Sequence, residues 1–233
     1  MLALLPQAMP AAAASAPASQ PAASCSVVAP TASAEQIVRA AERYLGREYV
    51  FGGRDGRPGC RDGKKRVRCL AGIDCQSLIF FAYESVLGRA WTRYSVMPSI
   101  SIQRGELGQP VPGLNGVLRD DVDRTLLRRG DVLFFLLEGY NLDADKALFE
   151  RGEAKYGTWH TGLVHCSDGG EVRVIHARPD DRVTIEPLDA IAFDALVVLR
   201  LNNPVRSSAV TRPAHLLPSS LPASAPAAAD RPR

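Results

Sequence analysis

Alanine, proline and serine dominate both ends of this 233-residue chain, so only its middle can supply a packed core. The two ends lack the large apolar side chains whose burial offsets the entropy lost when a chain is ordered. We expect a disordered leader or linker over 1–32, a single domain over 33–202 and a disordered tail over 203–233. A domain of that size can bury a real hydrophobic core.

The formal net charge is only +3, which gives no support for a nucleic-acid partner. No apolar run reaches the length of a bilayer span, so we expect no transmembrane segment. The chain opens with a short apolar segment, Met1–Leu5, that resembles the end of a secretion signal without a basic leading region. We therefore expect export to the periplasm or the extracellular space. A lipid anchor on Cys25 is an alternative with less support, because the residues before Cys25 fit a lipid-attachment box poorly.

The five cysteines bear on compartment and on metal binding. Cys60 and Cys69 flank a short, strongly basic loop, where a disulfide would suit an oxidising compartment. Two free thiols are the alternative. A zinc site is disfavoured because neither cysteine has a second ligand at close spacing. The later histidines and cysteine also match no common zinc pattern, so we expect no metal. These residues are His160, His165, Cys166 and His176.

Helical spacing is clearest after Asp74, a favourable N-cap residue. Apolar residues recur at three- and four-residue steps from Cys75 to Leu87, and Gly88 supplies a stop. This pattern predicts a helix over 75–87 with Cys75 at the start of its buried face. A similar pattern predicts an earlier helix over 34–45 with Ser33 as its cap, and Pro98 suits the opening of a short helix.

Strand signals dominate the second half of the domain. The apolar run 132–137 has strand length, and a turn at 167–170 joins strands expected over 159–166 and 171–177. Two more strands, over 182–186 and 195–201, complete the expected sheet. Proline and glycine predict loop over 110–116, and 143–153 is expected to be a short helical insertion. Helices followed by antiparallel strands indicate the α+β class.

Cys75, His160 and His176 together suggest nucleophilic catalysis. A helix N-terminus favours an anion, so we expect the pKa of the Cys75 thiol to be lowered. His160 begins one strand and His176 ends the next, and a tight hairpin would bring them to the same end of the sheet. Each residue alone is more often structural. Jointly they match a nucleophile, a base and a group that orients the base.

Five short stretches carry a resemblance to a known family. In this order and spread through residues 34–201, they resemble the NlpC family of papain-like cysteine peptidases, which act on peptidoglycan stem peptides. The stretches are Tyr49–Gly53, Gly72–Cys75, Arg129–Phe135, His160–Val164 and Val174–Ala177.

The resemblance implies a papain-like fold with N-terminal helices packed on an antiparallel sheet. It implies that Cys75 is the nucleophile, His160 the general base and His176 the orienting residue. Tyr49 would place its hydroxyl near the oxyanion, and no cofactor is implied. The expected partner is a stem peptide cut between D-glutamate and the diamino acid, by an enzyme that we expect to be a monomer.

Asp74 and Gln76 fall at positions that line the substrate groove in the family. Here the family's usual Asp-Cys-Ser-Gly reads Asp74-Cys75-Gln76-Ser77, which puts the usual peptide specificity in question. Insertions over 54–73 and 138–158 would reshape the cleft further. A thiol amidase, deamidase or acyltransferase, including a secreted effector, is therefore a second hypothesis, and a non-catalytic peptide-binding module is a third. His165 and Asp131 are expected to be structural.

Overall fold

The computed structural model describes residues 32–62, 65–168 and 171–201. Apart from residue 32, the predicted leader lies outside these ranges, as do Cys25 and the predicted tail, so these remain predictions. No helix within the described ranges is long and apolar enough to cross a bilayer.

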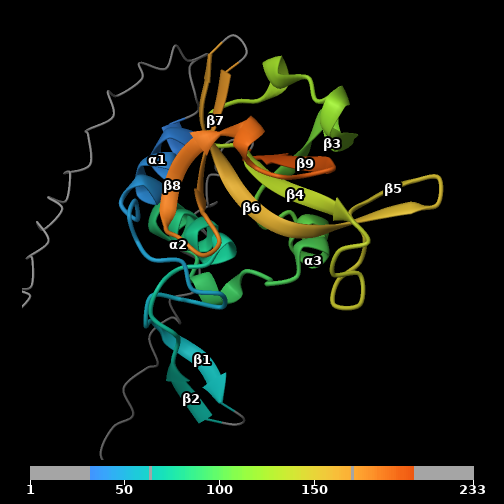
Figure 1. The fold of residues 1–233 in the computed structure, drawn as a ribbon. Coiled ribbons are helices and arrows are strands. Elements are labelled where there is room, and N and C mark those ends of the chain that lie inside the picture. Colours follow the sequence, from blue (N-terminus) through green and yellow to red (C-terminus); the bar gives the residue numbers. More distant parts are fainter. Residues whose placement is uncertain (1–31, 63–64, 169–170, 202–233) are drawn as a thin grey trace, which may run out of the picture.

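In the described part of the chain, three α-helices precede most of the strands (Figure 1). They are α1 (Ala32–Glu42), α2 (Cys75–Leu87) and α3 (Pro98–Gln103), so the helices expected from Cys75 and Pro98 are confirmed. Helix α1 begins at Ala32, ahead of the expected cap, and Ser33 therefore lies inside it. It also ends earlier than expected, and the chain passes through Gly46, whose φ of 78° suits glycine, into the next segment.

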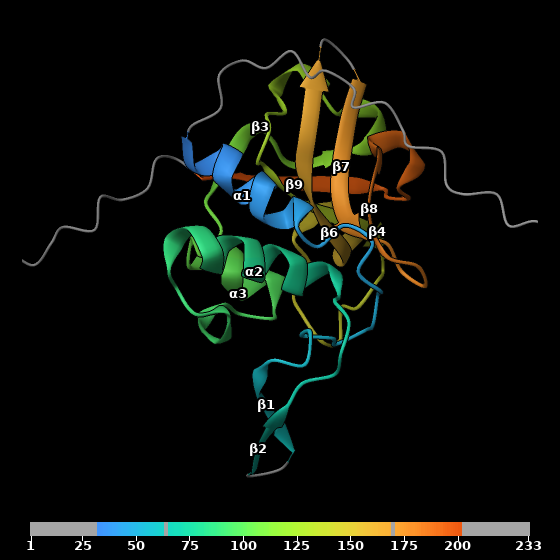
Figure 2. The same cartoon turned by 90° about the vertical axis from the view of Figure 1, so that its left-hand side faces the viewer.

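Seven antiparallel strands form the main sheet of the described residues, in the order β3-β9-β4-β6-β7-β8, with β5 paired to β6. A separate two-stranded hairpin projects from the body of the domain (Figures 1 and 2). The hairpin consists of β1 (Pro58–Asp62) and β2 (Lys65–Arg68). The main sheet consists of β3 (Gln109–Leu118), β4 (Val132–Glu138), β5 (Phe149–Arg151), β6 (Ala154–Asp168), β7 (Glu171–Ala177), β8 (Val183–Pro187) and β9 (Ala195–Arg200).

Two segments differ from the sequence-based expectation. The predicted loop over 110–116 lies within β3, an edge strand whose pairing with β9 is interrupted by bulges, and prolines are tolerated at such positions. The predicted helical insertion over 143–153 is wrong, because its second half forms β5. Gly152, with φ of 62°, makes the turn that pairs Phe149 with Tyr156.

Apolar side chains are buried on both faces of the sheet. On β4, Val132 and Phe134 belong to the core shared with the helices, whereas Leu133 and Phe135 belong to the core on the opposite face. Successive strand residues point to opposite faces, and burial of both faces explains the continuous apolar run. Figure 2 shows α1 and α2 lying over one side of the sheet. The sheet thus forms a rigid support for residues at the start of α2.

Candidate active site

The start of α2 is fixed by a reciprocal cap. The Asp74 carboxylate accepts a hydrogen bond from the Ser77 backbone N–H at 2.7 Å, and the Ser77 hydroxyl accepts one from the Asp74 N–H at 2.9 Å. This capping box satisfies two backbone donors that a helix start leaves unpaired. Cys75 is the first residue of the helix, partly exposed, and its thiol is free. The expected N-cap is therefore confirmed, and it holds the proposed nucleophile at the positive end of α2.

A paired-glycine turn packs against this cap. The Ser77 hydroxyl and the Arg54 guanidinium each donate to the Gly53 carbonyl oxygen at 2.8 Å, and Arg54 also pairs with the Asp74 carboxylate. A side chain at Gly53 would begin 2.7 Å from the carbonyl oxygens of Val50 and Gly72, so only glycine fits there. The glycine of this motif thus lets the chain after Tyr49 lie directly against the helix start.

The Cys75 thiol lies close to Thr161, the residue that follows His160 on β6. The Thr161 hydroxyl and the backbone N–H groups of Thr161 and Gln76 face the thiol and lower its pKa. The Thr161 hydroxyl makes no hydrogen bond of regular geometry within the described residues. The nucleophile thus lies beside the residue that follows its proposed base.

Burial nevertheless raises the pKa of Cys75 to about 11, and the Asp74 charge adds to this effect. Arg54 pairs with that carboxylate and offsets part of its charge, so burial is the dominant cause. The expectation of a lowered thiol pKa is therefore wrong for this resting arrangement. Loss of hydration outweighs the helix dipole, and Cys75 rests as a neutral thiol.

His160 and His176 meet at the same end of the sheet, as expected from the hairpin. His160 Nε2 lies 2.6 Å from His176 Nδ1, and the two rings meet edge to face. His176 Nε2 lies 2.8 Å from the Glu186 carboxylate on β8. A carboxylate only accepts, so His176 donates through Nε2 and accepts through Nδ1. His160 must then donate through Nε2, which leaves its Nδ1 lone pair available to accept a proton.

The surroundings of His160 keep its ring neutral. The ring is only 1% exposed and stacks near Phe135 and Trp159, with centroid distances of 5.8 Å and 5.0 Å. Burial, and to a smaller extent the nearby His176, lower the pKa of His160 to about 3. Burial is also the main cause that lowers the pKa of His176, although Glu186 opposes it. At physiological pH the imidazole is therefore neutral, and its Nδ1 atom keeps a free lone pair.

Glu186 was not anticipated from the sequence. It pairs in register with Val174 and reaches His176 diagonally across two strands. A single acid near the end of a short strand has no distinctive spacing, so only the register of β7 with β8 identifies it.

Tyr49 and Gln76 have different relations to the thiol. Burial raises the pKa of the Tyr49 hydroxyl to about 12, and the nearby Cys75 and Asp74 contribute to the increase, so this hydroxyl remains a hydrogen-bond donor. The Gln76 side chain instead donates to the Val96 carbonyl at 2.8 Å. This hydrogen bond connects the start of α2 to the segment before α3. Gln76 takes no part in the cap of α2, which Asp74 forms.

Two further expectations concern structural residues. The His165 Nε2 atom lies 2.9 Å from the Glu42 carboxylate and connects β6 to α1, as a structural role requires. The Asp131 carboxylate pairs with Arg200 at 2.7 Å and accepts from the Arg128 N–H. Neither residue is joined to the His160–His176–Glu186 chain by a hydrogen bond in the described ranges. Within those ranges, no group of three or more potential ligands is arranged to hold a metal ion.

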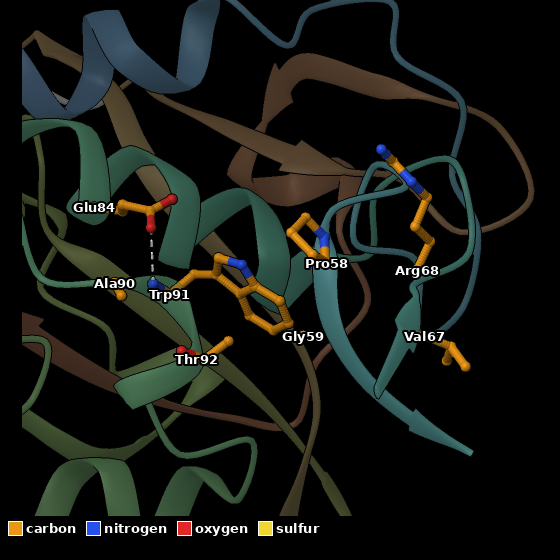
Figure 3. A pocket seen from close by; sticks show the side chains of 8 residues that line it. All are labelled: Pro58, Gly59, Val67, Arg68, Glu84, Ala90, Trp91 and Thr92. Atoms are coloured by element: carbon orange, nitrogen blue, oxygen red, sulfur yellow. Dashed lines mark hydrogen bonds between the residues drawn. The ribbon is translucent and has the colours of Figure 1, made fainter. Parts of the chain in front are cut away.

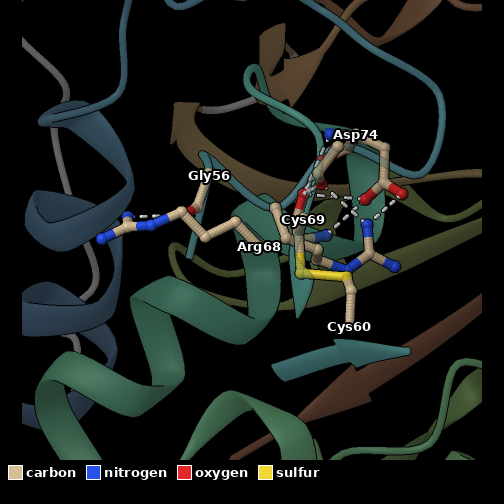
Figure 4. The surroundings of a disulfide bond; sticks show 8 residues. Gly56, Cys60, Arg68, Cys69 and Asp74 are labelled. Atoms are coloured by element: carbon tan, nitrogen blue, oxygen red, sulfur yellow. Dashed lines mark hydrogen bonds and ion pairs between the residues drawn. A yellow bond between two sulfur atoms is a disulfide. The ribbon is translucent and has the colours of Figure 1, made fainter. Parts of the chain in front are cut away.

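The disulfide expected between Cys60 and Cys69 is present (Figure 4), with an S–S distance of 2.02 Å. It joins Cys60 on β1 to Cys69, which directly follows β2 on the segment that leads back to Asp74. Arg68, beside this disulfide, donates to the Gly56 carbonyl at 3.2 Å. The first insertion is therefore a crosslinked hairpin anchored close to the start of α2.

Comparisons with known proteins find likeness at the level of structure. No protein-family model matches the sequence, and no curated protein matches it significantly. An N-acetylmuramoyl-L-alanine amidase from Bacteroides uniformis has a TM-score of 0.51 and 12% identity, over 73% of this chain and 99% of that one. The peptidoglycan hydrolase RipB from Mycobacterium tuberculosis has a TM-score of 0.41 and 20% identity, over 74% of this chain and 66% of its own. RipD from the same organism, a non-catalytic NlpC/p60 domain protein adapted to peptidoglycan binding, has a TM-score of 0.37 and 19% identity, over 73% of this chain and 98% of its own.

The chain spans just under two thirds of the length of RipB. At these identities the shared property is the fold. The expected α+β class is confirmed, and the fold is shared with the amidase, whose TM-score is above 0.5. The NlpC family remains a prediction from the five motifs.

Proposed function

We propose that this protein is a cysteine peptidase that hydrolyses an amide bond in peptidoglycan stem peptides. The observation that carries the proposal is one constellation. The free Cys75 thiol lies close to Thr161, the residue that follows His160, and His160 is the first ring of a hydrogen-bonded chain that ends at Glu186. A nucleophile, a base and an oriented second histidine are the groups that acyl transfer through a thioester needs.

The neutral resting state indicates how the reaction begins. His160 Nδ1 takes the thiol proton as the Cys75 sulfur attacks the carbonyl carbon, so a stable thiolate is not required beforehand. The oxyanion would be stabilised by the Cys75 backbone N–H and the Tyr49 hydroxyl, and one such donor is typically worth about 3–4 kcal/mol. His160 then returns the proton to the leaving amine. It next activates water, which hydrolyses the thioester and restores the thiol.

The glutamate completes the chain electrostatically. As His160 becomes protonated, positive charge develops on two linked imidazoles that lie among apolar side chains. The Glu186 carboxylate on His176 offsets that charge and holds the tautomer that leaves His160 Nδ1 basic. His176 and Glu186 are therefore positioning residues.

The substrate is proposed from the family resemblance and the fold. The motifs around Cys75, His160 and His176 point to stem peptides, and the bond between D-glutamate and the diamino acid is the first to test. The Cys60–Cys69 disulfide supports an exported protein, since such bonds persist in oxidising compartments. Gln76 favours a second candidate, an amidase acting on a different amide. Its side chain donates a hydrogen bond to the Val96 carbonyl beside the nucleophile, at a position where the family usually has serine.

Digestion of a stem-peptide panel separates these functions. Purified tri-, tetra- and cross-linked stems are incubated with the full chain, and the products are identified by mass spectrometry. We expect wild type and His165→Ala to cleave the stems and His160→Ala to be inactive. His165→Ala is the control, because His165 contacts Glu42 and is not hydrogen-bonded to the His160–His176–Glu186 chain. If every stem stays intact while another amide is cleaved, the substrate is wrong and the mechanism stands. If His160→Ala retains full activity, the proposed base is wrong.

A further inference from the structure

Hollows of different character lie along α2. A wide pocket of about 660 Å³ lies between the β1–β2 hairpin and the short helix η1 (Trp91–Arg93), as Figure 3 shows. Its acidic side chain, Glu84, pairs with Arg57 and accepts a hydrogen bond from the Trp91 backbone N–H, so this carboxylate has its partners. A small cavity beside Cys75 differs, because polar groups in its wall have no partner among the described residues.

The small cavity lies between α2, α3 and the sheet. Its wall is mostly apolar, and Gln76 and Thr161 bring it next to Cys75. The centre of a water-sized sphere can move through about 10 Å³ of it, which is room for a single water molecule. Among the residues of the wall, all but Gln76 and Ser95 are fully buried. The cavity is therefore nearly closed to solvent.

Two hydroxyl groups in this wall have no hydrogen-bond partner among the described residues. They belong to Ser101 on α3, which is 1% exposed, and Thr161 on β6, which is 2% exposed. A buried hydroxyl without a hydrogen bond is unfavourable, and ordered water is the usual partner where protein groups do not supply one. One water molecule between the two hydroxyls would satisfy both.

We propose that one water molecule occupies this cavity, bridges Ser101 and Thr161, and directs the Thr161 hydroxyl proton toward the Cys75 sulfur. The water accepts a hydrogen bond from the Ser101 hydroxyl and donates one to the Thr161 oxygen. The Thr161 proton then points to the thiol, which this hydroxyl faces.

The same hydroxyl acts when the thiol is deprotonated. Once His160 has taken the proton, the Thr161 hydroxyl donates a charge-assisted hydrogen bond to the thiolate. Thr161 and Ser101 are therefore positioning residues for the nucleophile. This inference deepens the proposed function and rests on it for the role of Cys75.

The cavity also gives a role to Gln76, where this chain departs from the family's usual serine. The Gln76 side chain donates to the Val96 carbonyl at 2.8 Å, and this hydrogen bond joins the start of α2 to the segment before α3. Both segments contribute to the wall of the cavity. A serine side chain ends before Cγ and Cδ, so it would not span the same gap. Gln76 thus keeps the water separate from bulk solvent.

Alkylation of Cys75 by iodoacetamide at pH 8 tests this arrangement without substrate. The rate is followed by mass spectrometry of the Cys75 peptide from the oxidised full chain. Thr161→Val removes the hydroxyl but keeps the shape, and we expect about tenfold slower alkylation because the thiolate loses one hydrogen bond. Ser101→Ala removes one partner of the water and should slow alkylation about threefold. Thr161→Ser restores the hydroxyl and should return the rate to that of wild type.

Thr158→Val is the matched control for these variants. The Thr158 hydroxyl is also buried and without a hydrogen bond on β6, but Thr158 does not line the cavity, so its loss should leave the rate unchanged. The ionisable groups that act on the thiol, Asp74 and Tyr49, are the same in every variant, as is His160.

A crystal structure of the wild-type chain tests the water itself. It should show one water about 2.5–3.0 Å from both hydroxyl oxygens. A cavity without this water, a wild-type rate in Thr161→Val or Ser101→Ala, or equal slowing by Thr158→Val overturns the inference. Neither measurement uses a stem peptide, so a failure to cleave stems would refute the proposed function and leave this water site in place.

Discussion

The buried ion pair between Arg54 and Asp74 should be essential for stability. Their side chains are each only 9% exposed, and Arg54 also donates to the Gly53 carbonyl. Arg54→Met keeps the bulk but leaves the Asp74 carboxylate buried without a partner. Breaking a buried pair in this way typically costs about 3–5 kcal/mol. We expect a loss of that size in the free energy of unfolding, measured by urea titration of the oxidised full chain.

An exposed pair of the same type provides the control. Arg47 pairs with Asp55 on the surface, where the arginine side chain is 54% exposed. Arg47→Met should therefore cost less than about 1 kcal/mol. Adding Asp74→Asn to Arg54→Met should recover stability, since asparagine still caps a helix and carries no charge. A loss below about 1 kcal/mol for Arg54→Met, or no recovery in the double variant, would refute the reasoning.

Three other predictions concern titration and the histidine chain. Because the pKa of Cys75 is raised to about 11, the rate of its alkylation by iodoacetamide should increase about tenfold per pH unit from 7 to 10. A rate that reaches a plateau near neutral pH would contradict the neutral resting thiol. The pKa of His160 is lowered from 6.5 to about 3, so the unfolded chain binds the proton first as pH falls. Stability should therefore decline from pH 6.5 toward 3, by up to about 1.4 kcal/mol per unit from this residue, and His160→Gln should flatten the decline in urea titrations at each pH. Glu186→Gln should lower kcat by about 10–100-fold. This is less than the loss of about 10⁴-fold that follows removal of a buried triad carboxylate, because the Glu186 side chain is 18% exposed. An unchanged kcat would exclude its positioning role.

Strong local signals made the main elements predictable. Asp74, the apolar spacing that follows it and Gly88 specify α2, and the structure shows both the capping box and the left-handed glycine at its end. The hairpin turn after Cys166 likewise implied that His160 and His176 meet, as their 2.6 Å contact confirms. Each of these inferences needed only neighbouring residues and one short-range pairing.

Features that depend on distant pairing were not predictable. The contact between Glu186 and His176 requires the register of β7 with β8, and the pairing of Arg54 with Asp74 requires the insertion to fold back on the helix start. The raised pKa of Cys75 is also a tertiary effect, since the helix dipole alone would lower it and burial reverses the sign. The loop-like prolines of β3 misled because an edge strand tolerates them.

An acyl-enzyme on Cys75 is the most direct test of the central claim. The full chain is mixed with a purified stem peptide, quenched in acid within the first turnovers and examined by intact-protein and peptide mass spectrometry. The account predicts a mass increase equal to the acyl half of the peptide, located on the segment that contains Cys75 and absent from Cys75→Ala. Cleavage of the stem by Cys75→Ala at the wild-type rate, with no adduct in either protein, would contradict it.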